Sequence, residues 1–396
     1  MKPSTPRNRG FSADRLARIV PALQRYVDQG RIAGTVTLAA RHGEICHFQK
    51  IGMAVIEDRQ AMHLDSLFRI YSMTKPIASV AVLMLLEEGL LRLTDPVSQY
   101  LPAFGALKVR ETAPGSPARL VDLVRPITIH DLLTHTSGLS HGFEDDEMGA
   151  LYRKDVVPSE ENRTQTLEHW VELVLGMPLA HQPGTRFRYS YATDVLGLLV
   201  QLISGMPFDQ FLQRRLFEPL GMVDTGFHVP PEKLNRFAAL YGPGDAGRLF
   251  AIDAPRTSAF AQPTSCPRGC GGLVSTAQDY FRFAQMLLDC GKGRGGLLGR
   301  KTIELMMANH LPAGVHPFDD PAAGFGLGGS VVLDVGGLRT PGSRGSFSWS
   351  GAANTTFWID PSEQLIGIFL VQHMPFDGLF PPSRDFTTLV YQALAD

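Results

Sequence analysis

The sequence predicts an α/β (α+β) fold in which an antiparallel β-sheet is flanked by helices and carries a helical insert domain. Two observations lead to this prediction. Segments with the alternating apolar pattern of strands lie near both ends of the 396-residue chain, whereas the middle carries the periodicity of helices. The length also exceeds what one small core requires, so one large domain or two interlocked domains are expected.

The first part of the chain is expected to contain a helix, a strand pair and a second helix. Ser12 is the expected N-cap of the first helix, and Pro21 predicts a kink inside it because proline removes a backbone hydrogen bond. A tight turn separates the two strands, which favours a hairpin. In order, these elements are expected over residues 12–28, 34–40, 44–49 and, for the long apolar second helix, from about Ser72 to Leu90.

The middle of the chain is expected to be mainly helical. Thr128 and Asp131 form a capping-box pattern, which predicts that a helix begins there. Glycine and proline separate the helical stretches from one another, and the polar segments between them are expected to be surface loops that shape a cleft. The further helices are expected over residues 165–175, 193–203 and 207–217, and the loops over 110–126, 140–165 and 228–268.

Strands return in the last part of the chain, and a final helix ends it. The chain therefore divides into an α/β domain, residues 10–92 together with 275–396, and a mainly helical domain with cleft loops, residues 93–274. The last strands are expected over residues 328–335, 346–349, 355–360 and 365–372, and the final helix over 384–395.

Composition and charge exclude several classes of partner. The net charge of -2 and the isoelectric point near 6.6 provide no basic surface for nucleic acid or for an anionic membrane. Cys266 and Cys270 lack the spacing of a zinc site or a redox pair, so no metal or cofactor is expected. Residues 1–7 lack the apolar core of a secretory signal, which predicts a cytoplasmic protein of undetermined oligomeric state.

Ser72 and Lys75 are the first candidates for chemistry. Residues three apart lie on one face of a helix, so the lysine amine can reach the serine hydroxyl. Pro76 places both near the start of that helix, where free amides favour a developing negative charge. Burial is expected to lower the pKa of the lysine and so to make its amine a proton acceptor. On spacing alone, an N-cap serine beside a solvated lysine is the favoured explanation of the pair.

Other segments of the chain carry motifs that accompany Ser72 and Lys75. Tyr189 lies in the stretch 187–197, and Trp349-Ser350-Gly351 lies on an expected strand. With the stretches 135–139, 220–225 and 271–276, they resemble the motifs of the serine β-lactamase-like superfamily in content and order. That superfamily includes class C β-lactamases, DD-peptidases and family VIII carboxylesterases. The resemblance extends from about residue 12 to the C-terminus and implies a β-lactamase/DD-peptidase-like fold.

The resemblance implies a role for each matching residue. Ser72 matches the nucleophile, Lys75 its base or base partner, and Tyr189 the tyrosine that shares the proton shuttle. The stretch Trp349-Ser350-Gly351 occupies the place of Lys-Thr-Gly and is expected to bind substrate. The backbone amides of Ser72 and Ala352 are then expected to form the oxyanion hole.

Departures from the superfamily pattern narrow the expected chemistry. Tyr191, expected to contact substrate, stands where the pattern has asparagine, and Trp349 and Ser350 replace the lysine and threonine that help to bind a substrate carboxylate. The sequence most resembles family VIII carboxylesterases, which implies hydrolysis of short to medium esters through an acyl-enzyme on Ser72. A β-lactamase, a DD-peptidase and an acyltransferase remain alternatives, as does a catalytically silent binding protein on the same scaffold.

Two other patterns resemble functional motifs. The stretch 138–142 matches the Gly-x-Ser-x-Gly elbow around Ser140, with His135 as a possible base, but a helix rather than a strand is expected before it. We expect Ser140 to be a loop serine and His135 to be structural. The glycine-rich stretch 324–329 precedes a strand rather than a helix, so it predicts a bend into the sheet instead of a dinucleotide site.

Overall fold

A computed structural model describes residues 10–112, 117–160, 162–244 and 248–396 of the chain. The expectation for residues 1–7, and parts of the three expected loops, lie outside this description. Within it, eight strands form one antiparallel sheet. In their order across the sheet, the strands are β10 (Ala323–Phe325), β11 (Ser330–Val332), β12 (Phe347–Ser350), β13 (Thr356–Asp360), β14 (Leu365–Val371), β1 (Gly34–Arg41), β2 (Glu44–Val55) and β3 (Gln60–Ala61).

The pairing of β1 with β14 joins the two ends of the chain. The register runs from Thr35 opposite Val371 to Arg41 opposite Leu365, seven consecutive residue pairs. All residues of both strands are buried, as expected for central strands that are covered on both faces. The prediction that strands from both ends of the chain belong to one sheet is therefore confirmed.

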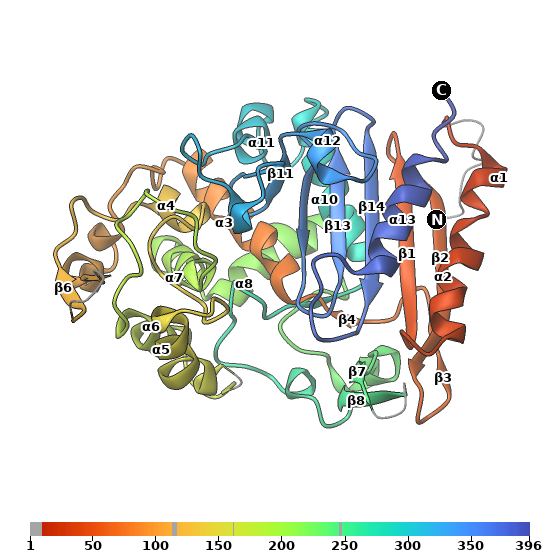
Figure 1. The fold of residues 1–396 in the computed structure, drawn as a ribbon, viewed down its shortest axis with the longest axis horizontal. Helices are drawn as coiled ribbons and strands as arrows, with labels where there is room; N and C mark the ends of the chain where they lie inside the picture. Colours follow the sequence, from red (N-terminus) through yellow and green to blue (C-terminus); the bar gives the residue numbers. More distant parts are fainter. Residues whose placement is uncertain (1–9, 113–116, 161, 245–247) are drawn as a thin grey trace.

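Helices from both ends of the chain cover the outer face of the sheet (Figure 1). Ile19 and Phe386 pack in a core cluster with Phe369 of β14. The backbone N–H of Ser12 donates to the carbonyl of Ala393 at 2.8 Å, so the two ends lie together. These helices are α1 (Ala13–Leu16), α2 (Ile19–Asp28) and α13 (Pro381–Tyr391).

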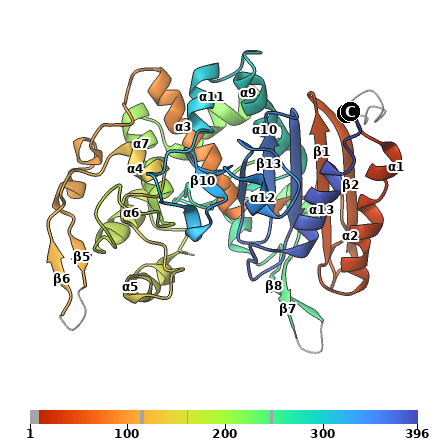
Figure 2. The ribbon, with the colours of Figure 1, turned by 45° about the horizontal axis from the view of Figure 1, so that its top comes forward.

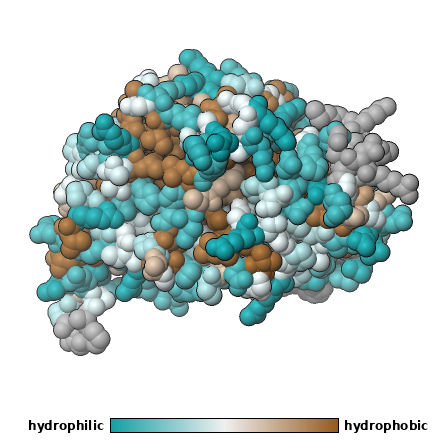
Figure 3. Space-filling view, turned by 90° about the horizontal axis from the view of Figure 1, so that it is seen from above, coloured by the Kyte–Doolittle hydropathy of each residue, from teal (hydrophilic) through white to brown (hydrophobic). Residues whose placement is uncertain are grey.

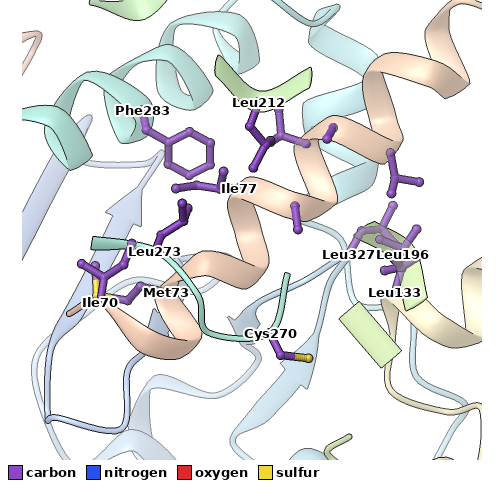
Figure 4. Packing of buried hydrophobic residues seen from close by; sticks show 14 of the residues in the cluster. Ile70, Met73, Ile77, Leu133, Leu196, Leu212, Cys270, Leu273, Phe283 and Leu327 are labelled. Atoms are coloured by element: carbon purple, nitrogen blue, oxygen red, sulfur yellow. The ribbon is translucent and has the colours of Figure 1, made fainter. Parts of the chain in front are cut away.

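The inner face of the sheet packs against the main core, which extends to the helical region. Helix α3 (Thr74–Glu87) is buried on all sides from Thr74 to Leu85, which explains its continuous apolar sequence. Figure 4 shows Met73 and Ile70 at the start of this helix and Cys270 on a segment that passes it. Beyond α3 lies α7 (Ala192–Ser204), and α10 (Ala277–Gly291) lies under the sheet.

The helical region lies on one side of the sheet, and two hairpins project from the body (Figure 2). On the surface seen from above, hydrophobic residues gather in separate patches among hydrophilic ones (Figure 3). The remaining elements are α4 (Ile129–Leu133), α5 (Glu147–Asp155), α6 (Leu167–Leu175), α8 (Phe208–Leu212), a π-helical turn (Gln213–Phe217), α9 (Glu218–Leu220), α11 (Arg300–Met306), α12 (Val335–Leu338), β4 (Phe68–Arg69), β9 (Val274–Ser275), and the hairpins β5 (Val109–Glu111) with β6 (Arg119–Val121) and β7 (Leu240–Pro243) with β8 (Leu249–Asp253).

The structure confirms several helix predictions and corrects others. The capping box of Thr128 and Asp131 is present at the start of α4. The N-terminal helix is broken before Ile19 rather than at Pro21, because Pro21 falls in the first turn of α2, where its missing N–H is tolerated. The expected loops contain α5 and the two small hairpins, whose short or polar segments lack a clear apolar period. The division into two domains stays a prediction.

Among the described helices, none is by itself long and apolar enough to cross a membrane. The bent pair Ala192–Ser204 and Phe208–Leu220 passes that test of length and composition when taken together.

The buried His47 on β2 predicts how stability depends on pH. Burial lowers its pKa from 6.5 to about 4, while Nε2 lies 2.8 Å from the hydroxyl of Thr37. Between these pH values the unfolded chain binds a proton that the folded chain does not bind. Stability is therefore complete above pH 6.5 and falls as the pH decreases toward 4, by roughly 3 kcal/mol at about 1.4 kcal/mol per pKa unit.

Urea unfolding of wild type and His47→Gln between pH 7 and 4 tests this expectation. The variant should lose less stability than wild type over this range, because glutamine cannot titrate. His63→Gln, at an exposed histidine, is the matched control. Equal pH slopes for wild type and His47→Gln would contradict the expected role of His47.

Candidate active site

Ser72 lies in a single 3₁₀ turn, Tyr71–Met73, that runs directly into α3. Tyr71 has a φ of 42°, so the chain turns sharply just before the serine. Strand β4 leads into this turn and is held by the buried Arg69, whose Nε donates to the carboxylate of Asp253 at 2.8 Å. The serine therefore lies at the N-terminal end of a buried helix, on a segment fixed from both sides.

Lys75 connects this serine to the segment that passes α3. Its Nζ donates to Ser72 Oγ at 3.3 Å and to the backbone carbonyl of Cys270 at 2.8 Å. The side chain of Lys75 is fully buried. The spacing of three residues therefore brings the two groups together, as the sequence predicts.

The same peptide segment is held by Asp194 of α7. One carboxylate oxygen accepts the backbone N–H of Cys270 at 2.7 Å, and the other accepts the indole N–H of Trp170 at 2.7 Å. Asp194 is fully buried. Cys270 thus receives a hydrogen bond from Lys75 at its carbonyl and gives one to Asp194 from its amide.

The pKa of Lys75 is raised, which makes the sequence-based expectation of a neutral amine wrong. Burial by itself disfavours the ammonium, which was the basis of that expectation. The anionic forms of Cys270 and Tyr189, a hydrogen bond with Tyr189 and the carboxylate of Asp194 favour the ammonium and together outweigh the burial. The carboxylate of Asp194 is therefore one cause of the raised pKa of Lys75.

Tyr189 precedes α7 and is buried beside Lys75, whose Nζ lies 4.5 Å from the centre of the tyrosine ring. Aromatic rings surround it, including those of His135 at 4.9 Å and Trp349 at 5.6 Å between ring centres. The three residues that the sequence singles out, Ser72, Lys75 and Tyr189, therefore lie together in the structure.

Strand β12 brings Trp349-Ser350-Gly351 to the same place. A Cβ on Gly351 would lie 2.3 Å from the carbonyl oxygen of Ile70, so only glycine allows this strand end to approach the start of the serine turn. The backbone N–H of Ala352 donates to no acceptor among the residues that the structure describes. The amide is therefore free to bind a ligand oxygen, as an oxyanion-hole donor requires.

Tyr191 lies one layer behind the other predicted site residues. Its ring is fully buried and stacks on His141 at 4.0 Å, and its hydroxyl donates to Glu160 at 3.3 Å. Arg268 forms an ion pair with the same carboxylate at 2.8 Å. Tyr191 therefore supports the wall of the site, and the expectation that it contacts substrate stays a prediction.

The two other patterns are structural, as the sequence indicates. Ser140 lies in the loop between α4 and α5, where its hydroxyl accepts a hydrogen bond from Arg188 Nε at 2.9 Å. His135 Nδ1 lies 3.0 Å from the hydroxyl of Ser190, and among the described residues no hydrogen bond joins His135 to Ser140. The glycine-rich stretch forms the turn between β10 and β11, which confirms the expected bend.

Three site residues escape the sequence-based reasoning. The carbonyl of Cys270 is a backbone group and leaves no side-chain signal. Asp194 lies in the stretch 187–197. An acidic residue in the first turn of an otherwise apolar helix is the sequence signal that could have identified it. His141 is a variable position inside the elbow motif, so the motif gives it no role. Among the described residues, no group of three or more histidine, cysteine, aspartate or glutamate side chains could hold a metal ion.

Comparison with known proteins shows close relatives over almost the whole chain. A family model described as beta-lactamase matches residues 19–391. An uncharacterized protein of Mycobacterium tuberculosis is 37% identical over 365 residues, which is 89% of each chain. Esterase EstB of Burkholderia gladioli is 29% identical over 387 residues, covering 94% of this chain and 93% of EstB.

A solved structure is also similar to this chain over almost its whole length. The structure of EstCE1, described as a hydrolase with promiscuous acyltransferase activity, superposes with a TM-score of 0.81 at 28% identity. The match covers 97% of this chain and 99% of EstCE1. The expected β-lactamase/DD-peptidase-like fold, with an antiparallel sheet and flanking helices, is therefore confirmed.

The role of Asp194 can be tested by Asp194→Asn. The substitution removes a negative charge that raises the pKa of Lys75, so that pKa should fall. It also places an amide NH₂ against an N–H donor, which should destabilise the fold by about 1–3 kcal/mol. Nuclear magnetic resonance titration of the lysine side chains and urea unfolding measure the two effects. Asp209→Asn, at an exposed acid, is the control, and an unchanged Lys75 pKa in Asp194→Asn would contradict this role.

Proposed function

The chain belongs to the beta-lactamase family of serine hydrolases, and on that premise we propose that it is a serine carboxylesterase. It would hydrolyse short to medium esters through an acyl-enzyme on Ser72. The observation that carries the proposal is the contact of Lys75 Nζ with Ser72 Oγ at 3.3 Å, beside the ring of Tyr189 at 4.5 Å.

In the proposed acylation step, Ser72 Oγ attacks the ester carbonyl carbon and loses its proton to the Lys75/Tyr189 pair. The pair can accept this proton when it holds one proton fewer than an ammonium and a phenol together would hold. The carbonyl oxygen takes up the electron pair and is held by the amides of Ser72 and Ala352. The C–O bond of the ester then breaks, and the leaving alkoxide takes the proton from the pair.

Deacylation would use the same groups in the same order. A water molecule gives a proton to the Lys75/Tyr189 pair and attacks the acyl carbon, and the electron pair of the breaking bond returns to Ser72 Oγ, which takes the proton back from the pair. The pair therefore ends the cycle with the same number of protons as it began. No group outside the chain is needed for this proton balance.

The residues at the end of β12 favour a neutral ester over a substrate that carries a carboxylate. Trp349 and Ser350 provide a ring and a hydroxyl rather than an ammonium, and the hydroxyl of Ser350 already donates to Thr356 at 3.2 Å. The relative named esterase EstB supports ester hydrolysis as the activity. The description of EstCE1 favours acyl transfer to an alcohol as a second activity of the same acyl-enzyme. The cytoplasmic location stays a prediction.

Substitution of the two candidate serines tests the proposal. Ser72→Ala should lower kcat/KM for p-nitrophenyl butyrate by roughly 10³-fold or more, because the covalent route is lost. Ser140→Ala, the matched control, removes only the hydrogen bond with Arg188 and should stay within about tenfold of wild type, since one such bond contributes about 1 kcal/mol.

The alternatives give different results in the same assay. Full activity of Ser72→Ala, or loss of activity only in Ser140→Ala, would overturn the proposal. Faster turnover of a chromogenic cephalosporin than of the ester would indicate a β-lactamase. Formation of a butyrate ester when a primary alcohol is added would show acyl transfer.

A further inference from the structure

Two exposed phenylalanine rings flank Tyr189. Phe143, on the loop before α5, is 65% exposed, and Phe318, on the 3₁₀ turn Pro317–Asp319, is 66% exposed. Their ring centres lie 5.9 Å and 6.0 Å from that of Tyr189. Exposed apolar residues that stand singly are ordinary, whereas rings that gather at one place indicate a binding site, and here two of them lie beside one candidate catalytic group.

The rings are oriented so that flat faces line the approach to Tyr189. The plane of Phe143 lies within 13° of the plane of Tyr189, and the plane of Phe318 lies within 21° of that of Trp349, at 6.3 Å. Stacked and offset-stacked rings attract one another through such faces. The rings thus form two nearly parallel pairs beside Lys75, and the planes of Trp349 and Phe318 are tilted by 43° and 52° from that of Tyr189.

Buried rings hold Phe143 in place from behind. Phe143 stacks on His141 at 4.0 Å and 12°, and His141 stacks in turn on Tyr191 at 4.0 Å. Burial lowers the pKa of His141 to about 3, so the stack consists of uncharged rings at neutral pH. This support fixes the orientation of the exposed ring before any ligand arrives.

The turn that carries Phe318 is strained. Phe318 and Asp319 have φ values of 52° and 58°, in a region that side chains other than glycine seldom adopt. Two such residues in succession raise the energy of the turn, and strain of this kind gathers at ligand-binding positions. The strained turn holds the ring of Phe318 against Phe187, at 5.3 Å between ring centres.

From this geometry we infer that Phe143 and Phe318 are specificity-determining residues that bind a flat, uncharged, apolar group of the ester, an aryl or similarly conjugated group. The inference rests on the proposed function, because it places this group beside the proposed acyl-enzyme site. Aromatic rings also attract cations, but the charged amine of Lys75 already lies 4.5 Å from the ring of Tyr189 and repels a second cation.

Matched ester pairs test this inference, and each pair differs only in the flatness of one ring. Benzyl butyrate and cyclohexylmethyl butyrate test the alcohol side, and 4-nitrophenyl phenylacetate and 4-nitrophenyl cyclohexylacetate test the acyl side. In at least one pair, wild type should prefer the aromatic ester by roughly 2- to 12-fold in kcat/KM, the range expected for one ring contact. Phe143→Leu and Phe318→Leu should bring this ratio close to one, mainly by raising KM for the aromatic ester.

Phe250→Leu is the matched control, because Phe250 is 51% exposed on β8 and should leave the ratio as in wild type. Dissociation constants of the same esters for Ser72→Ala give the preference for the aromatic ester without turnover. A failure of binding at Phe143 and Phe318 is therefore distinguishable from a failure of the proposed function. Ratios near one in both pairs, or ratios unchanged by both substitutions, would overturn the inference. Faster hydrolysis of butyrylthiocholine than of its neutral analogue 3,3-dimethylbutyl thiobutyrate would replace it with a cation site.

Discussion

The site depends on the two backbone polar groups of one residue, Cys270. Its carbonyl accepts a hydrogen bond from Lys75 of α3, and its amide donates to Asp194 of α7, so a single segment connects two buried helices. The amine of Lys75 and the carboxylate of Asp194 are thus each held by a hydrogen bond to the backbone of the same residue. Buried charges of opposite sign are tolerated only when they are paired or hydrogen-bonded in this way. The position of Lys75 under Ser72, and hence the candidate nucleophile itself, follows from this arrangement.

Sheet pairing and the main core make that arrangement possible. Strand β14 pairs with β1 and β13, and β13 pairs with β12, whose end approaches Ile70 just before Ser72. The serine turn is thus held by the sheet on one side and by α3 on the other. A change in sheet register would move Ala352 away from the turn. The fold therefore contributes to the chemistry by fixing distances between groups that lie far apart in the sequence.

Much of this fold could be predicted from the sequence, because local patterns carry it. The strand pattern at both ends, the capping box of Thr128 and the spacing of Ser72 and Lys75 all act over a few residues. Helix α10 was missed, although Thr276 caps it as Thr128 caps α4. The pKa of Lys75 could not be predicted, because it depends on Asp194 and on a backbone carbonyl from distant segments. Tyr191 was expected to contact substrate because of its position in the motif. A position in a motif does not show whether a side chain faces the substrate or supports the residues that do.

The most direct measurement is to identify which serine becomes covalently modified. Wild type mixed with an activated fluorophosphonate, or quenched during turnover of a slow ester, can be digested and mapped by mass spectrometry. The account predicts that the added mass lies on the peptide that contains Ser72 and that Ser72→Ala remains unmodified under the same conditions. Modification of Ser140 instead, or modification of Ser72→Ala at the rate of wild type, would contradict it.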